Sequence, residues 1–123
     1  MTDIVCDMRH AADTPRQRLD EYARLFAAAF VARQRTAHGV RWSLRAHPGI
    51  AEWAADLAAR EEACCAFLTI TVTVEGNRVR WDVASTDDPA ARAVVDLFYD
   101  LPVSPPADLD AVRLPVVGGR PDC

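Results

Sequence analysis

Residues 68–83 read LTITVTVEGNRVRWDV, and their pattern predicts a β-hairpin. Apolar residues alternate with threonine in its first half, which is typical of a strand with one buried and one polar face. Gly76-Asn77 is a hairpin turn signal, and the alternation resumes after it. The polar face of this predicted hairpin is expected to carry Thr69, Thr71, Thr73, Arg78, Arg80 and Asp82. The opposite face is expected to carry Leu68, Ile70, Val72, Val79, Trp81 and Val83.

The chain before the hairpin predicts one more strand and two helices. Residues 40–46 alternate in the same way and end at a Pro-Gly break. Thr14 and Gln17 form a capping box, and apolar residues at three- and four-residue steps extend the first helix to about Arg35. A second helix is expected over residues 50–66, and a third over residues 89–101. The sequence thus predicts a two-layer α+β fold with a three-stranded sheet, helices on one face, and the order α-β-α-β-β-α.

Length and composition indicate one small domain. The chain has 123 residues, of which 50% are hydrophobic, so it can form a core without a metal or a disulfide. We expect a single α+β domain over residues 1–103. Residues 104–123 are rich in proline and lack periodicity, which predicts a partly disordered tail. Truncation after Pro105 is therefore expected to preserve the fold.

Charge and hydropathy exclude several classes of partner. The net charge is −4, which argues against a nucleic-acid-binding surface. No apolar stretch is long enough to span a bilayer, and the N-terminus lacks the features of a secretory signal. We therefore expect a cytoplasmic protein without a membrane partner. In that compartment its four cysteines are expected to be mostly reduced.

The second predicted helix carries the residues with chemical potential. At 100° per residue, Glu61 falls in the centre of the apolar stripe marked by Ala54 and Leu57, and Cys64 and Cys65 flank it. The other acidic residues of the helix lie off this stripe. A buried carboxylate without a partner is costly, so Glu61 requires the thiols, an arginine, a cation or a polar ligand beside it.

This arrangement favours binding of a soft metal or metalloid, or of a small ligand, over redox chemistry. A reactive thiol normally lies near a helix N-terminus or a cation, whereas Cys64 and Cys65 lie at a helix C-terminus beside a carboxylate. Adjacent cysteines also form a disulfide poorly, because their Cα atoms are about 3.8 Å apart. The predicted metal ligands are Glu61, Cys64 and Cys65, with Cys6 as the third thiol and His10 behind it. Cys123, at the chain end, is expected to be free.

Two other functional classes remain open. The first is a thiol-dependent enzyme acting on a small molecule. The second is an interaction module in which both cysteines only pack and Glu61 pairs with an arginine. A three-stranded sheet covered on one face leaves two edges exposed, so we also expect a homodimer.

The segment Glu61-Glu62-Ala63-Cys64-Cys65-Ala66-Phe67-Leu68 resembles a group of small bacterial proteins. These proteins share a helix that ends in E-x-x-C-C-x-F and is followed by a hairpin. Similar segments occur fused to metal-responsive regulators of the mercury and arsenic type. The resemblance covers roughly residues 5–101 and implies thiol chemistry, with alanine at Ala66 where many relatives have proline. This chain has no recognisable helix-turn-helix, so the resemblance does not imply a regulator.

Overall fold

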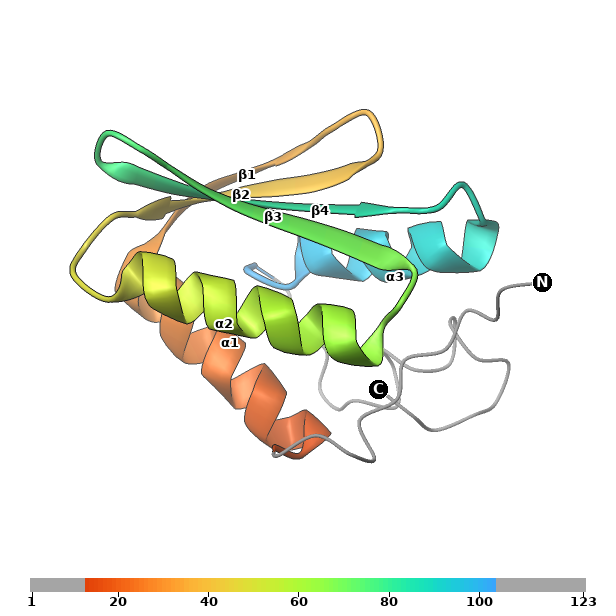
Figure 1. Cartoon of the computed structure of the whole chain (residues 1–123), viewed down its shortest axis with the longest axis horizontal. Helices are drawn as coiled ribbons and strands as arrows, with labels where there is room; N and C mark the ends of the chain where they lie inside the picture. Colours follow the sequence, from red (N-terminus) through yellow and green to blue (C-terminus); the bar gives the residue numbers. More distant parts are fainter. Residues whose placement is uncertain (1–12, 104–123) are drawn as a thin grey trace.

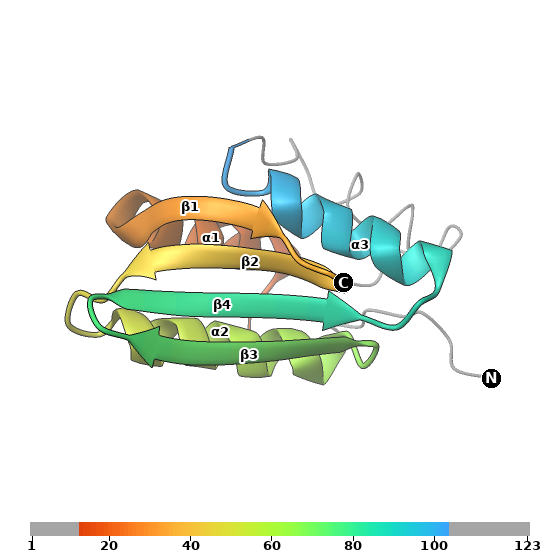
Figure 2. The ribbon, with the colours of Figure 1, turned by 90° about the horizontal axis from the view of Figure 1, so that it is seen from above.

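The computed structural model, which describes residues 13–103, contains a four-stranded antiparallel sheet with the strand order β1-β2-β4-β3. All three helices lie on one face of this sheet (Figure 1). Seen from above, the four strands run side by side, with two of the helices behind them and the third beside one end of the sheet (Figure 2). The α+β class and the single covered face are confirmed. The predicted three-stranded sheet is wrong, because the observed order is α-β-β-α-β-β-α.

The missing strand, β1 (Phe30–Arg35), follows directly on the first helix, α1 (Pro15–Ala29). The prediction extended the helix through these residues because Phe30 continues the helical spacing of Phe26. No glycine or proline separates the two elements, and the burial of β1 does not alternate strictly. Its register along β2 (Gly39–Arg45) also shifts between Phe30 and Ala32. An edge strand held by backbone pairing with its neighbour leaves little signal in its own side chains.

The hairpin of β3 (Leu68–Glu75) and β4 (Arg78–Ser85) has the predicted register. Thr71 pairs with Asp82 and Thr73 with Arg80, so these side chains share the polar face. Val79, Trp81 and Val83 are almost fully buried on the other face. Gly39, at the start of β2, lies so close to the neighbouring strand that an added Cβ would be 1.7 Å from the Val83 carbonyl oxygen.

Local sequence signals set the helix starts. The capping box of α1 is present, with Gln17 N–H donating to Thr14 Oγ1 over 3.2 Å. The second helix, α2 (Ile50–Cys64), follows Gly49, whose φ of 88° is readily adopted only by glycine. The third helix, α3 (Pro89–Asp100), has Asp88 as its N-cap. The second helix ends two residues before the predicted boundary, so Cys64 is its last residue.

An aromatic cluster fills the space between the sheet and the helices. The indole rings of Trp42 and Trp81 stack with centroids 4.2 Å apart, and Tyr22 and Phe98 pack against them. Both indole N–H groups donate to helix carbonyls, Trp42 to Phe98 and Trp81 to Ala54. These bonds leave no buried indole donor unsatisfied and tie the central strands to α2 and α3.

None of the helices within residues 13–103 has the length and apolar character needed to cross a bilayer. The sheet edges are β1 and β3. The homodimer and the cytoplasmic location stay predictions. The proposed tail, residues 104–123, lies outside the described residues.

Candidate functional site

The end of α2 brings three possible ligand side chains together. Glu61, Cys64 and Cys65 have only 6%, 7% and 1% of their surface exposed. One carboxylate oxygen and the two sulfur atoms lie within 4.8 Å of one another. Cys65 is the C-cap residue, and its backbone N–H donates to the Glu61 carbonyl over 2.8 Å. The predicted juxtaposition of these three residues is present.

The partner of Glu61 is Arg18, which comes from α1. Its Nη1 donates to Glu61 Oε1 and lies 3.8 Å from Cys64 Sγ. Arg18 is itself only 4% exposed. Of the four partners that the sequence left open for Glu61, the structure provides the arginine. The guanidinium beside the sulfur stabilises a thiolate at Cys64, whereas burial and the 3.6 Å contact from Cys64 Sγ to the Glu61 carbonyl oxygen favour the neutral thiol.

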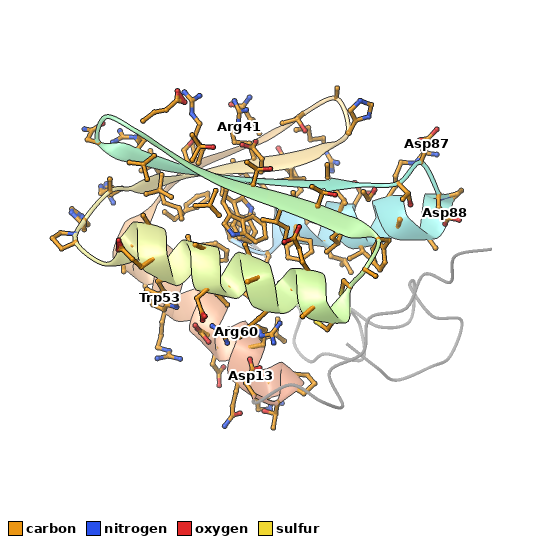
Figure 3. All side chains as sticks on the ribbon, in the orientation of Figure 1. Asp13, Arg41, Trp53, Arg60, Asp87 and Asp88 are labelled. Atoms are coloured by element: carbon orange, nitrogen blue, oxygen red, sulfur yellow. The ribbon has the colours of Figure 1, made fainter. Side chains whose placement is uncertain are left out.

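Two more carboxylates, those of Asp13 and Glu21, bind the arginines near this cluster. Asp13, at the N-terminal end of α1, accepts from Arg18 Nε over 2.6 Å and from Arg18 Nη2 over 2.8 Å. Arg60 donates to Glu21 Oε2 over 2.6 Å, and the Trp53 indole N–H donates to the same oxygen. Asp13, Trp53 and Arg60 lie along the two helices rather than toward the sheet (Figure 3). These contacts fix α1 against α2 and thereby fix Arg18 beside Glu61.

Burial and pairing act in opposite directions on the central ion pair. Burial raises the pKa of Glu61, and the Arg18 guanidinium limits that rise. Burial disfavours the charged form of Arg18, but its hydrogen bonds to Asp13 and Glu61 outweigh this and leave the pKa raised. An arginine stays protonated in proteins, so the Arg18 guanidinium is the positive charge that stabilises the carboxylate form of Glu61.

Tyr22 adds a hydroxyl to the same region. It lies one helical turn after Arg18 on the buried face of α1 and is 2% exposed. Its hydroxyl is buried and has no hydrogen-bond partner in the part of the chain that the structure describes. Burial raises the pKa of Tyr22 well above its ordinary value, and the charges of Glu61, Arg18 and Cys64 also act on it. Arg18 contacts both Glu61 and Cys64, so Tyr22 lies one helical turn from a residue that binds the cysteine cluster.

The two cysteines differ in redox state. Cys65 is disulfide-bonded in this structure, and the bond does not join it to its neighbour Cys64. The sequence predicted reduced cysteines, and Cys65 departs from that prediction. Both thiols are available together only after Cys65 is reduced.

Among the described residues, two surface hollows can be located away from this cluster. The larger, of about 420 Å³, is bordered by Arg35 and Arg92 near the start of α3. Asp96 and Asp87 already pair with these arginines, so its cations are neutralised. Asp87 lies in the turn just before the start of α3 (Figure 3). The smaller hollow, of about 300 Å³, is mainly apolar and is bordered by Tyr22. Neither lining includes Glu61 or the cysteines.

Comparison with known proteins adds no assignment. No protein-family model, curated protein or solved structure matches the chain. The site must therefore be interpreted from its own residues. Cys6 and His10, the additional ligands predicted from the sequence, and the terminal Cys123 lie outside the described residues.

Sequence reasoning missed Arg18 as the partner of Glu61 and missed the buried hydroxyl of Tyr22. The buried face of α1 consists of Arg18, Tyr22, Leu25 and Ala29, at steps of four, three and four residues. Arg18 therefore interrupts an apolar stripe just as Glu61 does on α2. Two opposite charges at the centres of two apolar helix faces are a signal for a buried ion pair.

Asp13 and Glu21, the carboxylates outside the central ion pair, make the stability of the protein depend on pH. Hydrogen bonds from Arg18 to Asp13 and from Arg60 to Glu21 hold the pKa of each carboxyl below its ordinary value, 3.8 and 4.5 respectively. A lowered folded pKa stabilises the protein above the unfolded pKa, and this stability is lost as the pH falls through the folded value. We expect the free energy of unfolding to fall as the pH drops below about 4.5.

Urea unfolding measured across this pH range tests the prediction. Glu21→Gln should flatten the acid dependence, whereas the same change at the exposed Glu52 should leave it as in the wild type. Glu61 shifts in the opposite direction, so it offsets part of the effect. An identical pH profile for Glu21→Gln and the wild type would contradict the assignment.

Proposed function

We propose that this protein binds a thiophilic metal or metalloid ion through the thiolates of Cys64 and Cys65, with Glu61 beside them. The observation that carries the proposal is the convergence of three buried ligand atoms within 4.8 Å. Thiolates are soft ligands and select soft ions over Mg²⁺ or Ca²⁺. The resemblance of this segment to those found with metal-responsive regulators points to the same chemistry.

The charges of the site suit such an ion. Arg18 and Glu61 offset each other, so two added thiolates supply two negative charges. A divalent soft cation bound to both sulfurs gives a complex without net charge, which is the form that a buried site tolerates. Because Arg18 already occupies one oxygen of Glu61, we assign the sulfurs as the principal ligands and the carboxylate as an auxiliary one.

Reduction is a precondition for this function. A disulfide sulfur is not a thiolate ligand, and Cys65 is disulfide-bonded in this structure. The binding form is therefore the reduced protein, which fits a reducing compartment.

Ion binding by the reduced and the unreduced protein tests the proposal. After treatment with a phosphine reductant, the chain is expected to bind one Cd²⁺ or one arsenite, measured by equilibrium dialysis with elemental analysis. The unreduced protein should bind neither at the same site, and Mg²⁺ should not compete. A reduced chain that binds neither probe would overturn the proposal.

A thiol-dependent activity is the second candidate, and one observation favours it. Arg18 Nη1 lies 3.8 Å from Cys64 Sγ, and a guanidinium at that position supports a reactive thiolate. In that case Cys64 should react with iodoacetamide at neutral pH much faster than Cys65 in the reduced protein. Slow and equal reaction of both, followed by mass spectrometry, would exclude this candidate.

A further inference from the structure

The buried hydroxyl of Tyr22 has no structural explanation among the contacts of the described residues. Hydroxyl groups buried without a hydrogen bond are costly, and proteins rarely retain them. Phenylalanine would fill the same volume in this aromatic cluster and avoid the cost. Arg60 Nε is also buried without a partner, but the other nitrogens of Arg60 bind carboxylates. Among the described residues, Tyr22 is therefore the buried side chain whose polar group makes no hydrogen bond at all.

The surroundings of this hydroxyl indicate what would satisfy it. Tyr22 lies one helical turn after Arg18 on the buried face of α1, and Arg18 contacts Glu61 Oε1 and Cys64 Sγ of the cysteine site. Arg18 and Tyr22 both carry N–H or O–H donors, and Arg18 is positively charged. Such groups do not coordinate a bare cation, whereas they do bind an oxygen atom carried by the ligand.

Trivalent metalloid hydroxides bind thiols and also carry an oxygen atom that can accept a hydrogen bond. Each thiol replaces one hydroxide, so X(OH)₃ and two thiols give (RS)₂X–OH and two waters. Two X–O bonds break, two X–S bonds form, each thiol proton leaves with a hydroxide as water, and the oxidation state is unchanged. The product is uncharged and keeps one hydroxyl, whose oxygen accepts hydrogen bonds.

We propose that Tyr22 is a binding residue of the Glu61–Cys64–Cys65 site, and that its hydroxyl donates to the oxygen of a trivalent metalloid hydroxide held by the two thiols. This inference rests on the proposed ion-binding function and narrows its ligand class. Arg18 assists by placing a positive charge next to Cys64 and near the retained oxygen. The inference also explains why a tyrosine occupies a position at which phenylalanine would pack equally well.

The test compares Tyr22→Phe with the wild type, both reduced with a phosphine, using arsenite and Cd²⁺ as separate probes. Loss of one hydrogen bond should weaken arsenite binding by about tenfold. Cd²⁺ binding should change less than about twofold, because a bare cation accepts no hydrogen bond. Tyr99→Phe is the matched control, since the half-buried Tyr99 on α3 packs against the guanidinium groups of Arg33 and Arg35, and it should bind both probes like the wild type.

The outcomes separate the two proposals. Thermal unfolding of Tyr22→Phe should be unchanged or shifted upward, because the variant loses an unsatisfied hydroxyl. Equal arsenite affinity in Tyr22→Phe and the wild type would overturn the role of Tyr22 and leave ion binding standing. Binding of Cd²⁺ without arsenite would overturn the ligand class alone. Binding of neither probe by the reduced wild type would contradict the proposed ion-binding function itself.

Discussion

Replacing Arg18 with methionine is expected to lower the free energy of unfolding by about 3–5 kcal/mol. Methionine has a similar length but leaves the buried Glu61 without its cationic partner. Asp13 loses both of its hydrogen bonds to Arg18 as well. An uncompensated buried carboxylate carries the desolvation cost of its charge with nothing to offset it. Urea unfolding at neutral pH measures the effect.

A double variant provides the internal control. Arg18→Met combined with Glu61→Leu removes both central charges, so it should recover much of the loss, because apolar replacements of buried pairs are often neutral. Glu61→Leu alone should be mild, since Arg18 keeps Asp13. The exposed pair of Arg92 and Asp87 is the matched comparison, and Arg92→Met should cost at most about 1 kcal/mol. Similar losses for Arg18→Met and Arg92→Met would contradict the buried ion pair.

The elements with a strong local period could be predicted, and those held by tertiary pairing could not. The hairpin of β3 and β4 follows from alternation and a turn signal, and its register is as predicted. The strand β1 is held by backbone bonds to β2, and neither its composition nor its burial marks it as a strand. The helical spacing of apolar residues continues through Phe30, and β1 has no strand pattern of its own. The sequence therefore predicts a helix where the structure has a strand.

The same distinction between local geometry and tertiary packing applies to the candidate site. Glu61, Cys64 and Cys65 share one helix, so their convergence follows from helical geometry alone. Arg18 lies 43 residues away on another helix, and only the packing of α1 on α2 brings it to Glu61. The sequence argued against a reactive thiol because the cysteines adjoin a carboxylate. The Arg18 guanidinium weakens that argument, because it neutralises the carboxylate and contacts Cys64 Sγ.

Serine at either vicinal cysteine should abolish ion binding. Changes to groups that only support metal ligands typically cost 10–100-fold in affinity, so loss of a direct sulfur ligand should cost more than about 100-fold. Cys64→Ser and Cys65→Ser are each expected to reach that level for Cd²⁺ and arsenite in the reduced protein. Glu61→Gln should weaken binding without removing it, because the amide keeps the shape and loses the charge. Equilibrium dialysis of the four proteins measures these differences.

Stability distinguishes loss of a ligand from loss of the fold. Both cysteines are buried, so serine places a hydroxyl in the core and should lower the melting temperature by a few degrees, a loss of roughly 1 kcal/mol, while the protein stays folded. Alanine variants avoid the buried hydroxyl and should bind as poorly as the serine variants. Cys6→Ser tests the predicted third thiol, with Cys123→Ser as its control. Wild-type affinity in both Cys64→Ala and Cys65→Ala would mean that the cysteines only pack, and that the carboxylate in the apolar stripe of α2 serves its pairing with Arg18 alone.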